Sequence, residues 1–435
     1  MSINFKRTLS PTKFLWLVVL IATVGVASPA AASDGNSPAN STWGQWRGPQ
    51  GTGISDDNDL PIEWDDSNVV WTTELEGRGQ SSPIAWGDRI FLTTASNQGR
   101  DCAVVCIDLN SGQRLWNQKV VNDPPEKIHR MNTWATPTCA CDGQSVVASF
   151  GNAGLHCYDL DGKHRWSKDL GQFERSGWGS GSSPVIVGDL VIQTCDADNV
   201  SFLVGINKGD GQEVWRTPRP ELRSFSTPLL IDTGQRQELV LNGGAGMHAY
   251  DPSDGDLLWF CQGGSGRGTP TVVSGAGLVI AISGRRRGAG DMMAVRPGGT
   301  GDVTTQLEWS AARGSGRDLP SPIIVGDYLF AVDLRPGLAT CYQTATGKQL
   351  WRKRLAGNFS ASPIAAGGLI YALNEVGETT VIKPGPRYQE ISVNRLRTAE
   401  DEVFRASLMP YHGRLFCRSD KRLYCIAGTK KTDHE

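Results

Sequence analysis

The chain has 435 residues, with 43 Lys and Arg against 45 Asp and Glu, so its formal net charge is −2. A charge this close to zero argues against a general affinity for nucleic acids or other polyanions. The 52 glycines, with strand-forming residues between them, favour an all-β chain.

The N-terminus has the three parts of a secretory signal peptide. A basic head precedes an apolar run from Phe14 to Ala27, and Ala30-x-Ala32 follows as a cleavage site. The apolar run is too short for an ordinary membrane span, and no cysteine stands at the cleavage point to carry a lipid anchor. We therefore expect residues 1–32 to be removed and the protein to be exported, to the periplasm or the extracellular space, without stable membrane insertion. An uncleaved anchor is the alternative.

Two segments separate the signal peptide from the main domain. Residues 33–42 form a polar tail rich in Gly, Ser, Pro and Asn, which we expect to be disordered. Residues 43–68 contain the closely spaced Trp43 and Trp46, whose large indole side chains we expect to be packed against another part of the protein. We expect this tryptophan-rich segment to cover a face or an edge of the main domain.

Residues 69–427 consist of repeats, and 428–435 form a C-terminal tail. One mark is an Asp-to-Gly turn followed by a tryptophan four residues after the glycine, as in Asp108 to Trp116. Asp folds its side chain onto the backbone and Gly takes a positive φ, so the phrase predicts a hairpin turn. The second mark is Ser/Thr-Pro, which recurs every 40 to 55 residues or so: Ser82-Pro83, Thr136-Pro137, Ser183-Pro184, Thr227-Pro228, Thr269-Pro270, Ser321-Pro322, Ser362-Pro363 and the degenerate Ser407-Leu408-Met409-Pro410.

Each repeat reads as four short strands. In the first repeat these are residues 82–86, 89–94, 103–109 and 114–120. Eight repeats of four antiparallel strands predict an eight-bladed β-propeller.

The two ends of the domain complement each other. Val69 to Leu75 resembles the last strand of a blade but precedes the first repeat, whereas the repeat from Ala406 to Ile426 lacks its fourth strand. We expect the N-terminal strand to complete the eighth blade and close the ring, which removes two exposed sheet edges.

Other motifs leave alternatives open. The ten cysteines lie in the exported part, where disulfides can form, and Cys417 and Cys425 could pair across a hairpin. The alternative is that the cysteines are small buried apolar side chains. No cysteine pair with a nearby His completes a zinc set, so we expect no structural metal. Arg285–Arg287 lie in a glycine-rich insertion that is either a solvated loop or a contact for an anion or a partner.

The turn-and-tryptophan phrase, with its Ser-Pro openings, resembles the tryptophan-docking motif of pyrroloquinoline-quinone-like propellers. That family includes quinoprotein alcohol dehydrogenases and the propeller lipoprotein of the outer-membrane β-barrel assembly machinery. The opening Trp43-Gly44-Gln45-Trp46-Arg47-Gly48-Pro49 is similar to that of an exported, planctomycete-type group. The resemblance covers about Trp71 to Ala427. It implies that six tryptophans dock on the turn of a neighbouring blade and are structural: Trp71, Trp116, Trp166, Trp215, Trp259 and Trp351.

The same resemblance lets us ask whether this chain has the residues that quinoprotein dehydrogenases use for catalysis. Quinoprotein dehydrogenases clamp their quinone with a disulfide between adjacent cysteines, hold calcium with a Glu and an Asn, and use an Asp as base. This chain has no adjacent cysteines and no Cys-x-x-Cys-His for haem, and it is shorter. If it is an enzyme, Asp318 is the candidate base and Asn132 or Asn358 the metal-side ligand, with pyrroloquinoline quinone and calcium as cofactors.

Alignment of the eight prolines exposes a candidate site. Because side chains alternate along a strand, the positions five and three residues before each proline are expected to lie on the same face of the innermost strand, which lines the central channel. These columns bring together five arginines, two aromatic residues and two asparagines: Arg78, Arg223, Arg267, Arg317, Arg405, Trp134, Phe225, Asn132 and Asn358. Like charges around one funnel attract an anion. The alternative is that the arginines pair with local acids such as Asp318, Glu221 and Glu402.

From these patterns we expect a monomeric, exported, non-catalytic binding or scaffolding propeller that acts in envelope protein assembly and has an arginine-rich, anion-binding channel mouth. Its partner would be an envelope protein or an anionic ligand. A pyrroloquinoline-quinone-dependent alcohol or sugar dehydrogenase is the first alternative. A polysaccharide-binding propeller is the second, because Trp134, Trp178 and Phe225 are able to stack on sugars.

Overall fold

A computed structural model describes residues 42–263, 268–283, 290–313, 319–399 and 401–428. The chain divides into two units, residues 1–38 and 39–435, and every described residue belongs to the second. The expected signal peptide and nearly all of the polar tail therefore lie outside the described residues. So do Arg267, Arg317 and Asp318, and also the Arg285–Arg287 triplet.

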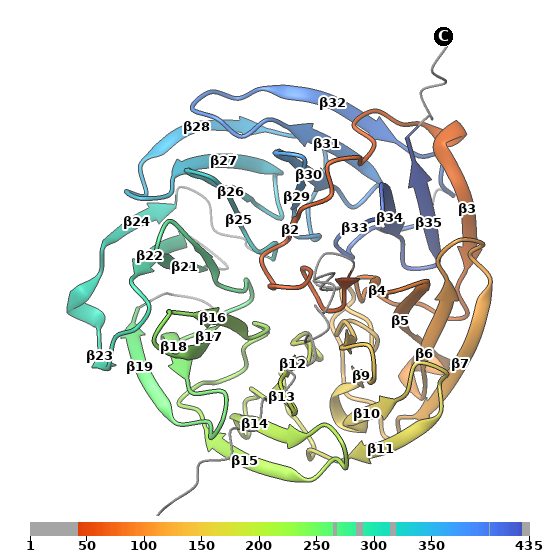
Figure 1. Cartoon of the computed structure of the whole chain (residues 1–435), viewed down its shortest axis with the longest axis horizontal. Helices are drawn as coiled ribbons and strands as arrows, with labels where there is room; N and C mark the ends of the chain where they lie inside the picture. Colours follow the sequence, from red (N-terminus) through yellow and green to blue (C-terminus); the bar gives the residue numbers. More distant parts are fainter. Residues whose placement is uncertain (1–41, 264–267, 284–289, 314–318, 400, 429–435) are drawn as a thin grey trace, which may run out of the picture. The chain divides into compact units, whose positions relative to one another are not determined.

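The described residues form eight small sheets arranged in a ring, as the repeats predict (Figure 1). Within each blade the strands pair antiparallel in chain order from the axis outwards. Blades 1 to 4 consist of β4 (Ile84–Trp86), β5 (Arg89–Ser96), β6 (Asp101–Asp108) and β7 (Arg114–Val121); β8 (Ala140–Cys141), β9 (Val146–Ser149), β10 (Leu155–Tyr158) and β11 (His164–Lys168); β12 (Val185–Val187), β13 (Leu190–Thr194), β14 (Phe202–Asn207) and β15 (Glu213–Pro218); β16 (Leu229–Asp232), β17 (Gln237–Asn242), β18 (Gly246–Tyr250) and β19 (Leu257–Gln262).

Blades 5 to 8 continue the ring with the same order of strands. They consist of β20 (Val273–Gly275), β21 (Leu278–Ser283), β22 (Gly290–Val295) and β24 (Trp309–Arg313); β25 (Ile323–Val325), β26 (Tyr328–Val332), β27 (Leu338–Gln343) and β28 (Gln349–Arg354); β29 (Ile364–Ala366), β30 (Leu369–Leu373), β31 (Glu378–Ile382) and β32 (Glu390–Arg395); β33 (Met409–Tyr411), β34 (Arg414–Arg418) and β35 (Arg422–Ala427), with β3 (Val69–Glu74) as the outermost strand.

The ring closes through strand β3, which pairs antiparallel with β35 over Val69 to Glu74. This confirms the expectation that the N-terminal strand completes the last blade, and Figure 1 shows the two ends of the propeller side by side in that blade. Three short strands extend other blades: β1 (Thr42–Trp43), β2 (Ile54–Ser55) and β23 (Gly301–Asp302). Within the described residues, helix is limited to the 3-10 turns η2 (Asp66–Asn68), η3 (Asn97–Gly99), η4 (Gly151–Ala153) and η5 (Thr304–Gln306).

The repeated turn has the chemistry that its sequence predicts. Asp108 accepts hydrogen bonds from the backbone N–H groups of Asn110 and Ser111, and Gly112 adopts a φ of 72°. A residue with a Cβ is strained at that φ, so glycine is needed there. The turn places Trp116 over the next blade, where its Nε1 donates to the carbonyl of Leu160 at 2.9 Å.

Most of the other tryptophans dock in the same way. Nε1 donates to a carbonyl of the next blade from Trp71, Trp166 and Trp351, and also from Trp309, which the sequence analysis did not include: the acceptors are Leu109, Lys208, Gly385 and Thr344. Trp215 lies against Gly255 of the next blade.

Trp259 departs from the pattern. It is fully buried and donates instead to Oε2 of Glu238 in its own blade, at 2.8 Å. Glu238 also accepts from the backbone N–H of Gly298, in the blade that follows. A buried carboxylate therefore takes the place of the turn carbonyl on which the other indoles dock.

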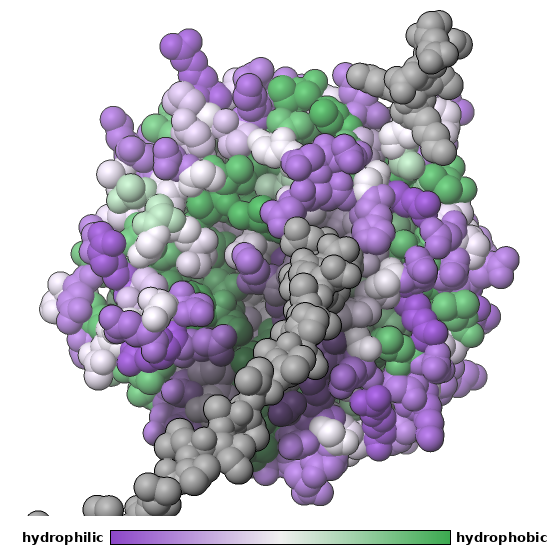
Figure 2. All heavy atoms as spheres, viewed as in Figure 1, coloured by the Kyte–Doolittle hydropathy of each residue, from purple (hydrophilic) through white to green (hydrophobic). Residues whose placement is uncertain are grey.

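Hydrophobic clusters lie mainly between neighbouring blades. One cluster joins Phe91 and Cys106 of blade 1 to Val146 and Tyr158 of blade 2. All ten cysteines are buried and free. Cys417 faces Tyr424 across the β34–β35 hairpin while Cys425 faces Phe416, so the two thiols lie on opposite faces of the sheet and cannot pair. On the face seen in Figure 2, hydrophobic side chains form separate patches among hydrophilic ones. None of the described helical turns has the length to cross a membrane.

Candidate functional site

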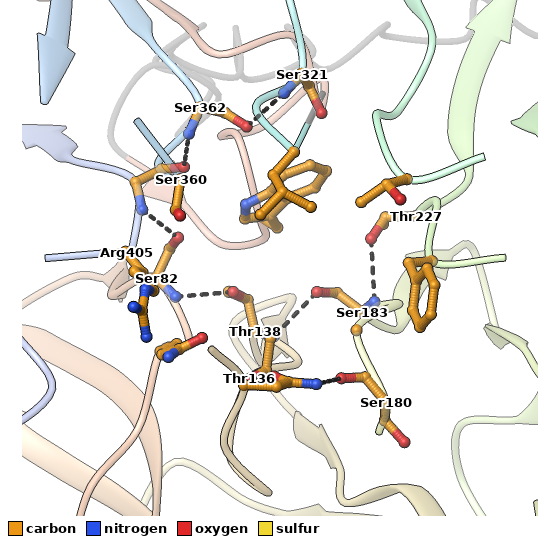
Figure 3. A pocket seen from close by; sticks show the side chains of 18 of the residues that line it. Ser82, Thr136, Thr138, Ser180, Ser183, Thr227, Ser321, Ser360, Ser362 and Arg405 are labelled. Carbon is orange, nitrogen blue, oxygen red and sulfur yellow. Dashed lines mark hydrogen bonds between the residues drawn. The ribbon is translucent and has the colours of Figure 1, made fainter. Parts of the chain in front are cut away.

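A cavity of about 220 Å³ lies on the axis of the propeller (Figure 3). Its lining residues come from the segments that connect the outermost strand of one blade to the innermost strand of the next, and from the N-terminal segment. The ring of blades therefore brings residues from the whole length of the domain to one site.

A closed ring of eight hydroxyl side chains surrounds the axis, and seven of them line the cavity. Each member donates its backbone N–H to the hydroxyl oxygen of the equivalent residue in the next blade, at 2.9 to 3.1 Å. Figure 3 shows the bonds between the members that line the cavity, such as those from Ser82 to Thr138 and from Thr138 to Ser183. The hydroxyl ring consists of Ser82, Thr138, Ser183, Thr227, Thr271, Ser321, Ser362 and Ser407.

A second tier lies two residues before each member of the hydroxyl ring. All eight residues at this position line the cavity, and they are chemically mixed: Gln80, Thr136, Gly181, Phe225, Thr269, Leu319, Ser360 and Arg405. Phe225 and Leu319 are apolar, and Arg405 is the one charged residue of the tier. The cavity therefore combines a polar wall with apolar surface on one side.

The connection between blades 1 and 2 forms part of the rim. The carbonyl of Met131 accepts hydrogen bonds from Gln80 Nε2, at 2.9 Å, and from Arg405 Nη1, at 3.1 Å. Asn132 Nδ2 donates to the carbonyl of Trp178, at 2.7 Å, and to that of Ser180. These bonds tie the segment to blades 1, 8 and 3.

An aromatic pair completes this side of the rim. His129 stacks on Trp178, with ring centroids 4.4 Å apart and an angle of 22° between the planes. Both rings line the cavity. Trp178 was expected to be able to stack on a sugar, and the structure places it at the cavity together with Phe225.

The N-terminal segment forms the other end of the site. Trp46 lines the cavity, and the adjacent Arg47 is buried, with its Nη2 donating to the carbonyls of Thr52 and Pro322. Burial lowers the pKa of Arg47 to about 9. The segment reaches several blades, because β1 pairs with β4, β2 pairs with β29, and the carbonyl of Gly44 accepts from the N–H of Cys141.

The structure separates the arginines that the proline alignment brings together. Arg405 lines the cavity, but its Nε donates to Oε1 of Glu375 at 2.9 Å. Arg78 is 59% exposed and lies 3.5 Å from Asp420. Arg223 pairs with Asp198 at 2.5 Å. Burial opposes a low pKa at Asp198, but the hydrogen bonds from Ser176 and Arg223 outweigh it, so the pKa of Asp198 is lowered. The described part of the mouth thus pairs its arginines with carboxylates.

The error lies in the repeat register. The hydroxyl ring uses Thr138 and Thr271, which follow the proline in repeats 2 and 5, and Ser407 in the degenerate repeat 8. The segments before the ring are also not strands: the innermost strand of blade 1 begins at Ile84, after the proline. In the register of the hydroxyl ring, Arg78 and Arg223 stand four residues before the ring and Arg405 stands two residues before it. Because these segments are not strands, the alternation of a strand does not bring the three side chains onto one face.

The remaining expected residues have structural contacts. Trp134 does not line the cavity; its Nε1 donates to the carbonyl of Glu126 at 2.7 Å. Asn358 is away from the cavity, and its carbonyl accepts from the N–H of Glu375. Asn132 reaches the cavity, but its Oδ1 accepts from Thr133 N–H and Thr136 Oγ1.

These contacts test the fit of a quinone with calcium. A calcium ligand needs a free oxygen, and the Oδ1 of Asn132 is already used twice within the protein. Among the described residues there is no group of three or more His, Cys, Asp or Glu side chains that could hold a metal ion. The proposed calcium role of Asn132 does not fit this geometry, and we derive no reaction step through the quinone.

The sequence analysis missed three parts of the site: the hydroxyl ring, Trp46 and the rim residues His129 and Met131. The ring had a signal, because most of its members are the Ser or Thr of the repeated Ser/Thr-Pro mark. We used that mark as an alignment anchor and not as a site. The rim had no signal in the repeats, because it lies in a connection that differs from blade to blade.

Comparison with known proteins agrees with the architecture. The family model described as outer membrane protein assembly factor BamB matches residues 42–128, 100–333 and 290–384. The BamB of Burkholderia pseudomallei (strain K96243) is 23% identical over 303 residues, which cover 66% of this chain and 69% of that protein.

Solved structures share the fold at low identity. BamB from Moraxella catarrhalis superposes with a TM-score of 0.59 at 18% identity, covering 84% of this chain and 99% of that one. A europium-containing methanol dehydrogenase gives a TM-score of 0.64 at 11% identity, covering 90% of this chain and 99% of that one. Because the family model spans most of the propeller, this chain belongs to the family of the outer membrane protein assembly factor BamB.

Proposed function

We propose that this protein is an exported, non-catalytic scaffold in the assembly of outer-membrane proteins. The observation that carries the proposal is the match of the BamB family model over residues 42–384. A propeller suits such a role because its blades form a rigid ring while its connections present a broad face to a partner.

Two ion pairs near the cavity support a binding role over a catalytic one. Arg405 pairs with Glu375, and Arg175 pairs with Glu126 at 3.0 Å with both side chains buried. Glu126 also accepts from the backbone N–H of Ser180, at 2.9 Å. These groups hold loops in place, whereas a general acid or base needs a position from which it reaches a substrate.

The cavity-side face is the surface that we assign to the partner. Four of the exposed apolar side chains lie on this face, spread around the ring. Val121 is 79% exposed and Leu222 is 68% exposed, and both lie where an outermost strand continues into a connection of that face. Val200 and Val376, in the β13–β14 and β30–β31 loops, are also exposed and lie on the same side of their blades.

The test is co-purification from the native cell envelope. A tagged full-length protein is expected to isolate the central β-barrel subunit of the outer-membrane assembly machinery at moderate salt. The double variant Val121→Glu, Leu222→Glu is expected to lose that subunit, because it places charge in the apolar contact.

Leu257→Glu is the matched control. Leu257 is 46% exposed but lies on the outermost strand β19, on the rim of the ring. The control variant should retain the partner. Recovery of the protein without any assembly subunit would refute the proposed function. Equal loss of the subunit from the double variant and the control would refute the assignment of the face.

A further inference from the structure

Seven of the eight hydroxyl side chains of the ring line the axial cavity. A hydroxyl has one proton to donate and two lone pairs, and in this ring each oxygen already accepts a backbone N–H. The accepted N–H occupies the side of the oxygen that faces the preceding blade. The hydroxyl proton is therefore available for a hydrogen bond to another acceptor.

One member of the ring returns its proton to the protein. Thr271 donates from Oγ1 to the carbonyl of Thr227 at 3.2 Å. Thr271 is also the one member that does not line the cavity. The other seven line it, and none of them donates its hydroxyl proton to a described residue: Ser82, Thr138, Ser183, Thr227, Ser321, Ser362 and Ser407.

These seven side chains are buried. Their exposed fractions run from 1% at Ser321 to 7% at Ser362. Buried polar groups are nearly always hydrogen-bonded, and a buried donor without a partner costs about 1 to 3 kcal/mol. Seven such donors around one small space therefore define a site that requires hydrogen-bond acceptors.

We propose that the hydroxyl ring binds a carboxylate group, carried either by a small carboxylic acid or by an acidic side chain of a partner protein. An ionised carboxylate only accepts hydrogen bonds and offers about four acceptor positions on two oxygens. Its bonds to O–H donors are charge-assisted and roughly twice as strong as neutral ones. A neutral sugar brings donors as well, and its hydrogen bonds to the ring lack the charge assistance that an ionised carboxylate provides.

The remaining lining suits the body of such a ligand. Phe225, Leu319 and Trp46 provide apolar surface beside the hydroxyl ring. The volume of about 220 Å³ equals that of about seven water molecules at ~30 Å³ each, which matches a short dicarboxylate or one acidic side chain. Arg405 lies at the rim, where its Nε donates to Oε1 of Glu375 and its Nη1 donates to the carbonyl of Met131. Glu375 therefore balances the positive charge of Arg405, and the selectivity for a carboxylate comes from the hydroxyl ring.

The proposal is argued from the hydroxyls in the interior of the ring and does not require the scaffold role to be correct. It is tested by isothermal titration of the full-length mature protein. Succinate is the small-molecule probe, a short Asp/Glu peptide is the protein probe, and glucose and the amidated Asn/Gln peptide are the neutral counterparts. We expect saturable binding of succinate, of the acidic peptide or of both, and no binding of the neutral probes.

Two ring variants separate ligand binding from ring stability. Thr138→Val and Thr271→Val each remove one acceptor from the hydroxyl ring, but only Thr138 lines the cavity. Thr138→Val should weaken binding about tenfold or more, the effect of one lost bond to a charged group, while Thr271→Val leaves it within about twofold. Ser183→Ala is a second cavity variant in case Thr138→Val does not fold, and thermal unfolding of each variant reports the stability change.

The outcomes decide between the sources of the carboxylate. Binding of succinate assigns the site to a small molecule, and binding of the acidic peptide alone assigns it to a partner protein; both support the proposal. It is overturned if neither carboxylate probe binds, if glucose binds as tightly as succinate, or if Thr138→Val and Thr271→Val weaken binding equally.

Discussion

The backbone N–H of Ser407 donates a hydrogen bond of 3.0 Å to Oγ of Ser82, and this bond joins the last blade to the first. It is the eighth bond of the hydroxyl ring and lies at the seam where the two ends of the domain meet. The same seam is closed at the rim by the pairing of β3 with β35. The propeller is thus closed both at its axis and at its edge.

Ser82→Ala should destabilise the protein by about 1 to 3 kcal/mol, because it leaves the buried N–H of Ser407 without an acceptor. Urea unfolding followed by tryptophan fluorescence measures the change. Thr346→Ala is the control: Thr346 is an exposed hydroxyl in a turn, where substitutions stay within about 0.5 kcal/mol. Equal effects of the two substitutions would show that the ring bond does not hold the seam.

Gly162→Ala tests the docking of Trp116. Gly162 has a φ of 84°, and a Cβ there would lie 2.8 Å from the Trp116 ring, so alanine adds both backbone strain and a clash. Gly188 has a φ of 58° with nothing within 4 Å, so Gly188→Ala adds the strain alone. We expect Gly162→Ala to cost about 1 to 3 kcal/mol more than Gly188→Ala in urea unfolding, the usual penalty of overpacking. A difference below about 0.5 kcal/mol would mean that the indole is not held on the turn.

His248 should make the fold sensitive to acid. Burial, with a smaller contribution from Arg219, lowers the pKa of His248 to about 4. The unfolded chain binds the proton from about pH 6.5 downwards, so stability is lost as the pH falls from about 6.5 to about 4. Glu221, 3.4 Å away, has a pKa raised by burial, and its contribution runs in the opposite direction, being lost as the pH rises through that pKa.

His248→Phe should therefore flatten the stability profile between pH 6.5 and 4 by about 1 to 3 kcal/mol. Phe keeps the aromatic contacts with Tyr250 and Phe260. Urea unfolding at half-unit pH intervals measures the profile. An unchanged slope would contradict a buried, neutral histidine at this position.

The ten cysteines should all be present as unreactive thiols. Burial raises the pKa of each of them, to about 11 at Cys157 and about 12 at Cys102, so little thiolate forms at neutral pH. A thiol reagent should label almost none in the native protein and ten in urea without reductant. Fewer than ten labelled thiols in urea would reveal a disulfide.

The fold was predictable because its signals are local and repeated. The turn at Asp108 to Gly112 needs only its own residues, and the eight Ser/Thr-Pro marks, one of them degenerate, specify the number of blades. The seam was predictable because Val69 to Glu74 carries the pattern of a missing fourth strand.

The site was less predictable because it depends on register. A proline lacks an N–H and fits next to a ring residue on either side, so Thr138 follows Pro137 whereas Ser82 precedes Pro83. Aligning the prolines shifted two of the eight repeats, and the degenerate eighth also fell out of register. The partners of the arginines were equally hidden, because Asp420, Asp198 and Glu375 come from loops of other strand pairs.

The proposed role in outer-membrane protein assembly is tested most directly by the abundance of outer-membrane β-barrel proteins in cells that lack this protein. Quantitative proteomics of the envelope should show a fall in these proteins after deletion, with recovery when the wild-type chain is restored. The Val121→Glu, Leu222→Glu variant should fail to restore them, and Leu257→Glu should succeed. Unchanged levels of β-barrel proteins in the deletion strain would contradict the account.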